Sequence, residues 1–218
     1  MQRRLKGSFF VISAPSGAGK TTLASKLVEK EKNLRVSVSF TTRQPRMGEV
    51  DGVDYTFVND STFRKMVARG EFAEWAEVHG KLYGTSKKKL EGLMRSGFDV
   101  ILDIDTQGAR QIRASFPKGV FIFILPPSMD VLRDRLEKRK KSDAKEDTDI
   151  DSRLKRAVEE IKEALGGIMG HAGHNIYDYV IVNDTLNNAL KGLEAVFTAE
   201  RLRTGRVEAR WIKENFLS

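Results

Sequence analysis

The chain has 218 residues, of which 40% are hydrophobic and 31% charged, and this length and composition fit a soluble globular protein of one or two domains. It contains no cysteine, which excludes disulfides, thiol catalysis and cysteine-ligated metal, and its three histidines are too few and too poorly spaced for a zinc site. The formal net charge of +8 favours anionic partners such as nucleic acid, anionic lipid or phosphorylated small molecules, and composition does not choose among them.

The N-terminal region carries two arginines and then a short apolar run at residues 9–14. This run is too short for the core of a signal peptide or for a membrane span. We therefore expect a cytoplasmic protein with no membrane partner.

The first predicted elements are a buried strand at 9–12, a glycine-containing loop at 13–19 and a helix that begins at Lys20. A strand, a glycine loop and a helix in this order form the context that a phosphate-binding loop requires. The backbone N–H groups of such a loop and the positive end of the helix dipole both attract phosphate. Lys20 can reach the β- and γ-phosphates of a nucleotide, and the Thr21 hydroxyl can ligate Mg²⁺.

The loop departs from the usual G-x-x-x-x-G-K-[S/T] pattern at its first position, where Ala14 replaces glycine. That position mainly needs a small side chain, and Gly17 and Gly19 still let the backbone curl around a phosphate. The alternative is an ordinary glycine-containing turn, but Gly-Lys-Thr placed directly after a strand favours the phosphate loop.

The next stretch alternates like a strand at residues 35–40 and continues into a loop at 41–55 that contains a proline and two glycines. Loops that combine arginines, hydroxyls, a carboxylate and a tyrosine are more often binding surfaces than spacers. A strand follows at 55–58. The pattern then predicts a helix from Asp60 or Ser61 to Arg69, an alternating strand at 72–78, a turn at 81–85 and a helix from Thr85 or Ser86 to about Gly97.

A buried strand at residues 100–105 carries the carboxylates Asp103 and Asp105 at its end. This is the arrangement of a Walker B element, which supports Mg²⁺. A polar strand end alone has many explanations, but downstream of a phosphate loop it indicates a carboxylate near the metal.

Helices and buried strands alternate over the rest of the chain. We expect a helix at 106–115, a strand at 120–125, a helix at 129–140 capped by Ser128, a charged connection at 140–152, a helix at 153–165, a glycine-rich break at 166–173, a strand at 179–183 and a last helix from Thr185 to about Arg203. This alternation predicts an α/β fold with a parallel sheet and helices on both faces.

Several of these segments, in order, resemble the guanylate kinase family. Residues 41–57, which read TTRQPRMGEVDGVDYTF, are similar to the family signature and lie at the expected distance after the phosphate loop. The resemblance continues through Glu74, residues 83–86, 102–108, 126–128 and 182–184, and the helical arginines, so it covers essentially the whole chain.

The resemblance implies a P-loop NTPase parallel sheet, a small GMP-binding lobe and a helical lid, all within one domain of residues 1–218. The implied core is about 1–36, 90–127 and 167–218, the lobe about 37–89 and the lid about 128–166. The implied reaction is ATP + GMP ⇌ ADP + GDP, with Mg²⁺ as cofactor, ATP and GMP (and dGMP) as substrates, and a role in purine nucleotide metabolism and GMP recycling.

Site residues follow from the resemblance position by position. Those implied for ATP are Ser16, Gly17, Ala18, Gly19, Lys20, Thr21, Thr22, Arg139, Arg153 and, beside the adenine, Asn183. Those implied for GMP are Ser39, Glu74, Thr85 and Asp103 at the guanine, and Arg43, Arg46, Tyr55 and Tyr83 at the phosphate. The charged groups implied to act in the transfer are Lys20, Arg46, Arg135, Arg139 and Arg153; Thr21 would ligate Mg²⁺, with Asp103 or Asp105 supporting it through water.

The chemistry of these side chains agrees with the implied roles. Guanine presents N1–H and the 2-amino group as adjacent donors, and a carboxylate such as Glu74 accepts from both, whereas adenine offers no such pair. Arginines and phenols offer charge-assisted donors to the dianionic phosphate of GMP. Taken singly, Glu74 could lie on a solvated strand face, and Tyr55 or Tyr83 could be a core aromatic; the matching signature favours the binding roles.

Two departures from the family pattern concern the lid. The family usually has a glycine after the second lid arginine, where this chain has Lys140, and the segment at 140–150 is longer and more charged than is typical. Arg139 and Arg153 could therefore sit differently in an open state. The simpler interpretation of the added lysines is that they solvate the lid.

Three other functions compete with the kinase. Guanylate-kinase-like scaffolds that bind proteins typically have a damaged phosphate loop, whereas Gly19, Lys20 and Thr21 are intact here. A P-loop kinase acting on AMP or a deoxynucleotide conflicts with Glu74 and Ser39. Nucleic-acid binding has the least support, because no basic–aromatic face is found outside the proposed active site, and we expect no nucleic-acid partner. The sequence does not indicate an oligomeric state.

Overall fold

A computed structural model describes residues 7–78, 80–142, 149–168 and 175–217 of the chain. Its central sheet has five parallel strands in the order β2-β7-β1-β8-β9. They are β1 (Phe9–Ser13), β2 (Leu34–Val36), β7 (Asp99–Asp103), β8 (Val120–Leu125) and β9 (Tyr179–Val182). The parallel α/β fold predicted from the sequence is therefore confirmed.

Helices cover both faces of this sheet because its strands are apolar on both sides. On one face, Phe10 and Ile12 of β1 pack with α1 (Lys20–Lys30) and α7 (Leu186–Arg201). On the other face, Phe9 and Val11 pack with α3 (Lys87–Arg95) and α4 (Thr106–Ser115). The successive residues of β1 thus build two separate cores.

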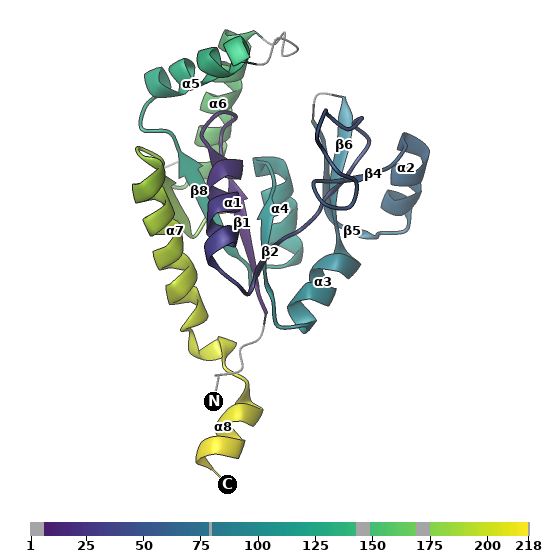
Figure 1. Cartoon of the computed structure of the whole chain (residues 1–218), viewed down its shortest axis with the longest axis vertical. Coiled ribbons are helices and arrows are strands. Elements are labelled where there is room, and N and C mark those ends of the chain that lie inside the picture. Colours follow the sequence, from purple (N-terminus) through teal and green to yellow (C-terminus); the bar gives the residue numbers. More distant parts are fainter. Residues whose placement is uncertain (1–6, 79, 143–148, 169–174, 218) are drawn as a thin grey trace.

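A second, smaller sheet stands beside the first and forms a lobe (Figure 1). Its order is β4-β3-β6-β5, and it comprises β3 (Phe40–Thr41), β4 (Thr56–Phe57), β5 (Phe72–Val78) and β6 (Lys81–Ser86). The helix α2 (Asp60–Ala68) closes it, with Phe63, Phe72 and Leu82 as its own small core.

Two helices in the region predicted to be the lid lie at the end of the sheet opposite α8 (Ala209–Phe216) (Figure 1). They are α5 (Met129–Ser142) and α6 (Ile150–Leu165), and they pack on each other through Leu132, Leu136, Leu154 and Ala157. Residues 143–148 of the predicted charged connection lie outside the described residues, as do residues 169–173 of the predicted glycine-rich break. Among the described helices, none is both long and apolar enough to cross a membrane.

Three local expectations were wrong, and one C-terminal region was missed. The predicted strand at 35–40 is two strands in different sheets, because the chain leaves β2 and crosses to the lobe at 37–39. The predicted turn at 81–85 is strand β6. The helix predicted from Arg153 begins at Ile150, because the Asp149 carboxylate accepts from the N–H groups of Asp151 and Ser152. A C-terminal 3₁₀ turn (Thr204–Arg206) and α8 (Ala209–Phe216) were not predicted.

Candidate active site

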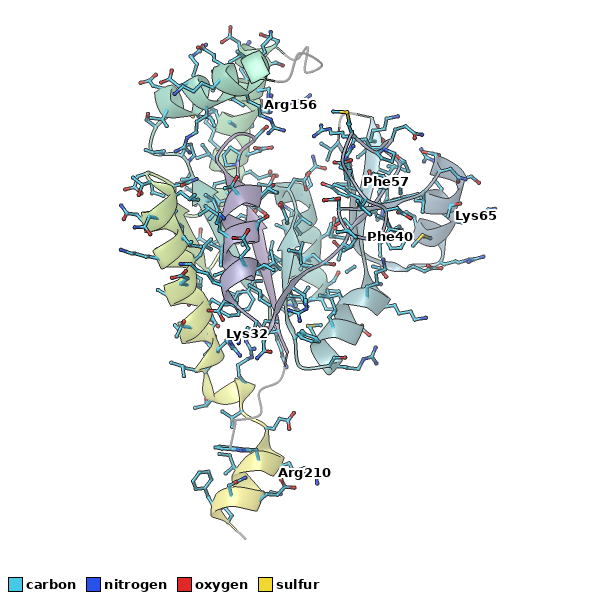
Figure 2. All side chains as sticks on the ribbon, in the orientation of Figure 1. Lys32, Phe40, Phe57, Lys65, Arg156 and Arg210 are labelled. Carbon is cyan, nitrogen blue, oxygen red and sulfur yellow. The ribbon has the colours of Figure 1, made fainter. Side chains whose placement is uncertain are left out.

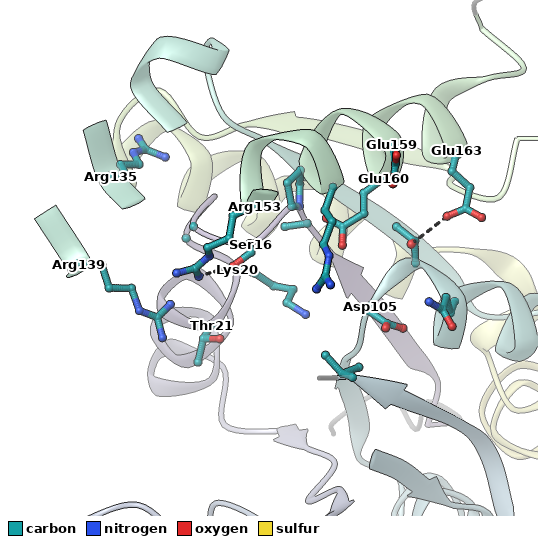
Figure 3. A pocket seen from close by; sticks show the side chains of 18 of the residues that line it. Ser16, Lys20, Thr21, Asp105, Arg135, Arg139, Arg153, Glu159, Glu160 and Glu163 are labelled. Atoms are coloured by element: carbon teal, nitrogen blue, oxygen red, sulfur yellow. Dashed lines mark hydrogen bonds between the residues drawn. The ribbon is translucent and has the colours of Figure 1, made fainter. Parts of the chain in front are cut away.

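A cleft of about 780 Å³ opens at the carboxyl ends of the parallel strands, between the lobe and the lid. This is the edge at which open α/β sheets bind ligands. Its walls are residues 14–22 without Ala18, the end of β5, the start of α4 and the facing sides of α5 and α6. Figure 3 shows positive side chains of the lid helices opposite Lys20 and Thr21.

The phosphate loop is held in its curled form by backbone conformation and by one buried amide. Gly17 and Gly19 have φ angles of 90° and 93°, the left-handed region that favours glycine. A Cβ on Gly19 would lie 2.5 Å from the side-chain nitrogen of Asn183, which donates a 2.7 Å hydrogen bond to the Ala18 carbonyl. Asn183, which was predicted to lie beside the adenine, is only 6% exposed, and its hydrogen bond to the Ala18 carbonyl stabilises the loop.

Lys20, Thr21 and Asp103 form one connected group at the start of α1. The Lys20 ammonium lies 2.5 Å from Asp103 Oδ1 and donates a 3.0 Å hydrogen bond to the Ile104 carbonyl. Thr21 Oγ1 donates a 3.0 Å hydrogen bond to the other oxygen of Asp103. A hydroxyl and a carboxylate side by side are hard oxygen ligands of the kind that Mg²⁺ prefers.

Asp105, the alternative metal-supporting carboxylate, has a different partner. Its side chain caps α4 by accepting a 2.8 Å hydrogen bond from the Gly108 N–H. Asp103 is therefore the carboxylate that the structure brings to Thr21.

The predicted lid arginines reach the phosphate loop from two helices. Arg135 on α5 donates to the carbonyl oxygens of Ala18 and Asn183, at 3.4 and 2.9 Å. Arg153 on α6 donates a 2.6 Å hydrogen bond to Ser16 Oγ. Arg139 lines the same cleft (Figure 3). All three cations are thus gathered around the place where phosphates would lie.

Sequence reasoning missed a charged stripe on α6 that also lines the cleft. It consists of Arg156, Glu160 and Glu163, with Glu159 beside it. Burial raises the pKa of Glu160 to about 7. Glu163 accepts a 3.1 Å hydrogen bond from Thr106 and forms an ion pair with Arg110 of α4. The spacing of 153, 156, 160 and 163 follows one helix face, so the helical period could have indicated it.

The guanine-reading carboxylate predicted in the lobe is buried and partnered. Glu74 is 4% exposed, and Thr85 Oγ1 donates a 2.6 Å hydrogen bond to its Oε1. Burial raises the pKa of Glu74 to about 7, although the hydrogen bond from Thr85 acts in the opposite direction. The predicted pair Glu74–Thr85 is therefore assembled across neighbouring strands β5 and β6.

The predicted phosphate-gripping residues gather around the lobe loop. The Arg43 guanidinium lies 5.3 Å from the centre of the Tyr55 ring, which makes an edge contact at 6.0 Å with Tyr83. Glu49, which was not predicted, accepts a 2.8 Å hydrogen bond from Arg43, and this bond lowers the pKa of the Glu49 carboxyl. Arg46 is exposed on the same loop.

Ser39 lies at the junction between core and lobe. It is half-buried, and its carbonyl oxygen accepts a 2.8 Å hydrogen bond from the Thr56 N–H. Figure 2 shows the side chains of the lobe, with Phe40 and Phe57 labelled, across the gap from the lid, where Arg156 is labelled. The site residues therefore come from three parts of the fold: the central sheet with its helices, the lobe, and the helices α5 and α6.

A phosphate loop at the carboxyl edge of a parallel sheet, with a Walker B carboxylate touching its lysine and threonine, defines the P-loop class of nucleotide-binding proteins. A sequence model of guanylate kinase matches residues 6–200. The guanylate kinase of Geobacter metallireducens is 52% identical over 202 residues, which are 93% of each chain, and that of Carboxydothermus hydrogenoformans is 46% identical over 96% of each chain.

A solved structure agrees with these sequence relatives. The crystal structure of guanylate kinase from Anaplasma phagocytophilum superposes with a TM-score of 0.74 at 35% identity, covering 99% of this chain and 98% of that one. The chain belongs to the guanylate kinase family.

Proposed function

We propose that this chain transfers the γ-phosphoryl group of ATP to GMP, and to dGMP, giving ADP and GDP or dGDP. The observation that carries this proposal is the buried carboxylate of Glu74, held by Thr85 in the lobe beside the phosphate-loop cleft. An ionised carboxylate there would accept from guanine N1–H and the 2-amino group together, and adenine cannot donate in this way.

The GMP phosphate is proposed to bind at the loop that carries Arg43 and Arg46. Tyr55 and Tyr83 pack edge to face next to the Arg43 guanidinium, and Arg46 lies on the same loop three residues further on. Such donors suit a dianion. Ser39, Thr85 and Asp103 are proposed to complete the guanine pocket.

ATP is proposed to place its phosphates on residues 16–22, with Lys20 between the β- and γ-phosphates. Thr21 would hold Mg²⁺, with Asp103 behind it through water. Mg²⁺ bound with ATP neutralises phosphate charge. Lys20 must then exchange Asp103 for a phosphate as its partner. Asn183 supports the loop from below and is proposed to lie close to the adenine.

The transfer needs no side-chain nucleophile. A phosphate oxygen of GMP attacks the γ-phosphorus in line, a P–O bond to GMP forms, and the P–O bond to ADP breaks. Lys20, Arg46, Arg135, Arg139 and Arg153 are proposed to stabilise the charge on the transferring group. Closure of lobe and lid would exclude water and so prevent wasteful hydrolysis of ATP.

We place this activity in the cytoplasm, on free nucleotides, as a step of purine nucleotide metabolism that recycles GMP. The intact contact between Lys20 and Asp103 supports an enzyme rather than a protein-binding scaffold. A coupled assay of ADP release with GMP, dGMP, AMP, CMP and UMP tests the proposal. Turnover with GMP and dGMP far above the others is expected, and equal turnover with AMP would overturn it.

A further inference from the structure

The edge strand of the lobe is paired with a side chain of the core. β5 is the last strand of its sheet, so its outer backbone groups have no strand partner there. Gln111 of α4 takes that place: its Oε1 accepts from the Trp75 N–H at 3.1 Å, and its Nε2 donates to the Trp75 carbonyl at 2.7 Å. One amide therefore satisfies both backbone groups of the residue that follows Glu74.

The same face of α4 also seats the Glu74 carboxylate. Gly108 precedes Gln111 by three residues, which places both on one side of the helix. A Cβ on Gly108 would lie 2.7 Å from Glu74 Oε2, and the Gly108 N–H is bound by Asp105. Glu74 therefore lies between Thr85 on its own sheet and the bare backbone of α4.

The contacts of Gln111 and Gly108 join helix α4, which packs on the central sheet, to strand β5 of the lobe. α4 starts just beyond β7, whose Asp103 touches Lys20, so its position is fixed relative to the phosphate loop. Glu74 belongs to the lobe. The distance from the carboxylate to the phosphate loop therefore depends on how β5 is held against α4.

We propose that Gln111 and Gly108 are positioning residues for base selection: Gln111 fixes the backbone beside Glu74, and Gly108 leaves room for its carboxylate. This inference rests on the proposed function, because it requires Glu74 to read guanine. A glutamine that only protected a sheet edge would affect stability, whereas this one acts on GMP recognition through Glu74.

The test uses Gln111→Met, which keeps the length of the side chain and removes both hydrogen bonds. Loss of two neutral hydrogen bonds at an exposed amide should raise KM for GMP by about five- to tenfold. KM for ATP should change less than twofold. Ser115→Ala, at an exposed position on the same helix, is the control and should leave both constants unchanged.

A double-mutant cycle with Glu74→Gln separates positioning from general damage. If Gln111 acts through Glu74, Gln111→Met should change KM for GMP less than twofold in the Glu74→Gln background. The inference would be overturned if Gln111→Met raised KM for GMP by the same factor in both backgrounds, or if it raised KM for GMP and KM for ATP equally.

Gly108→Ala gives an independent readout. Alanine favours a helix by about 1 kcal/mol over glycine, which offsets part of the strain of a Cβ 2.7 Å from Glu74 Oε2, so the fold should persist while the GMP-to-AMP ratio of kcat/KM falls at least tenfold. An unchanged ratio would overturn the role of Gly108. Failure of the proposed function can be told apart from failure of this inference. If the proposed function is wrong, the wild type itself will show no preference for GMP, whatever the variants do.

Discussion

The ammonium group of Lys20 lies 2.5 Å from Asp103, whose second oxygen accepts a hydrogen bond from Thr21. One carboxylate therefore holds both side chains that a nucleotide with Mg²⁺ would engage. The side chains of Lys20 and Asp103 are 20% and 23% exposed, so solvent still reaches the pair.

Asp103→Asn should weaken metal support without unfolding the protein. The amide keeps the shape and removes the charge behind Thr21, so we expect the Mg²⁺ concentration at half-maximal activity to rise at least tenfold. A Mg²⁺ titration of ADP release at saturating ATP and GMP measures this. An unchanged titration would exclude Asp103 from the metal site. The variant should still fold cooperatively, which thermal unfolding checks, because the amide keeps the size and shape of the carboxylate.

Lys20→Met should lower kcat by on the order of 10²–10³-fold or more, the usual cost of losing one preorganised charge-stabilising donor. The fold should persist because Lys20 points into the cleft. Lys26→Met removes an exposed lysine of the same helix, which forms an ion pair with Glu29, and is the matched control. Near wild-type turnover of Lys20→Met would refute the phosphate-loop assignment.

Arg43→Ala and, separately, Arg46→Ala should each raise KM for GMP more than tenfold, because a lost hydrogen bond to a charged group costs about 1.5–3 kcal/mol. KM for ATP should change much less. Arg64→Ala removes an exposed arginine of α2 in the same lobe and should leave both constants unchanged. Equal losses for both nucleotides would contradict separate sites.

The strand–loop–helix at 9–30 could be predicted because local chemistry determines it: an apolar run, two glycines and a lysine. Glu74 and Thr85 could be assigned only through the family resemblance, since their contact joins two strands. Gly84 misled the prediction of a turn. It lies inside β6, where a Cβ would come within 2.9 Å of Phe72 Cδ1, so the glycine serves packing rather than turning.

Contacts between distant segments were beyond sequence reasoning for the same physical reason. Gln111 and Trp75 are 36 residues apart, and nothing local to either marks them as partners. The start of α6 was missed because its first turn is as polar as the connection before it. Asn183 was expected beside a ligand, and its brace on the Ala18 carbonyl follows only from the packing of β9 under the phosphate loop.

The raised pKa of Glu74 makes stability depend on pH. With a folded pKa of about 7 and an ordinary value of 4.5, the folded state keeps a proton that the unfolded state has lost between these values. This contribution to the free energy of unfolding therefore falls as pH rises from 4.5 to 7, by on the order of 3 kcal/mol. Asp105 adds to the shift and Lys20 opposes it.

Denaturant titrations of wild type and Glu74→Gln at pH 5, 6, 7 and 8 measure this contribution. The difference in the free energy of unfolding between the two proteins should change with pH up to about pH 7 and level off above it. Glu160, whose pKa is raised in the same direction, is present in both proteins and cancels in the difference. A difference that does not vary with pH would show that Glu74 ionises normally.

The proposed recognition of guanine by Glu74 is tested by measuring kcat/KM for GMP, IMP and AMP in wild type and Glu74→Gln. A site built around a specific hydrogen bond can reject a partner that lacks it by about 10⁴–10⁵-fold, so wild type should prefer GMP to AMP strongly. IMP keeps N1–H but lacks the 2-amino group and should fall between them. Glu74→Gln should have a lower but measurable kcat/KM for GMP, and the gap between GMP and AMP should narrow. A GMP-to-AMP ratio that the substitution leaves unchanged would contradict the account.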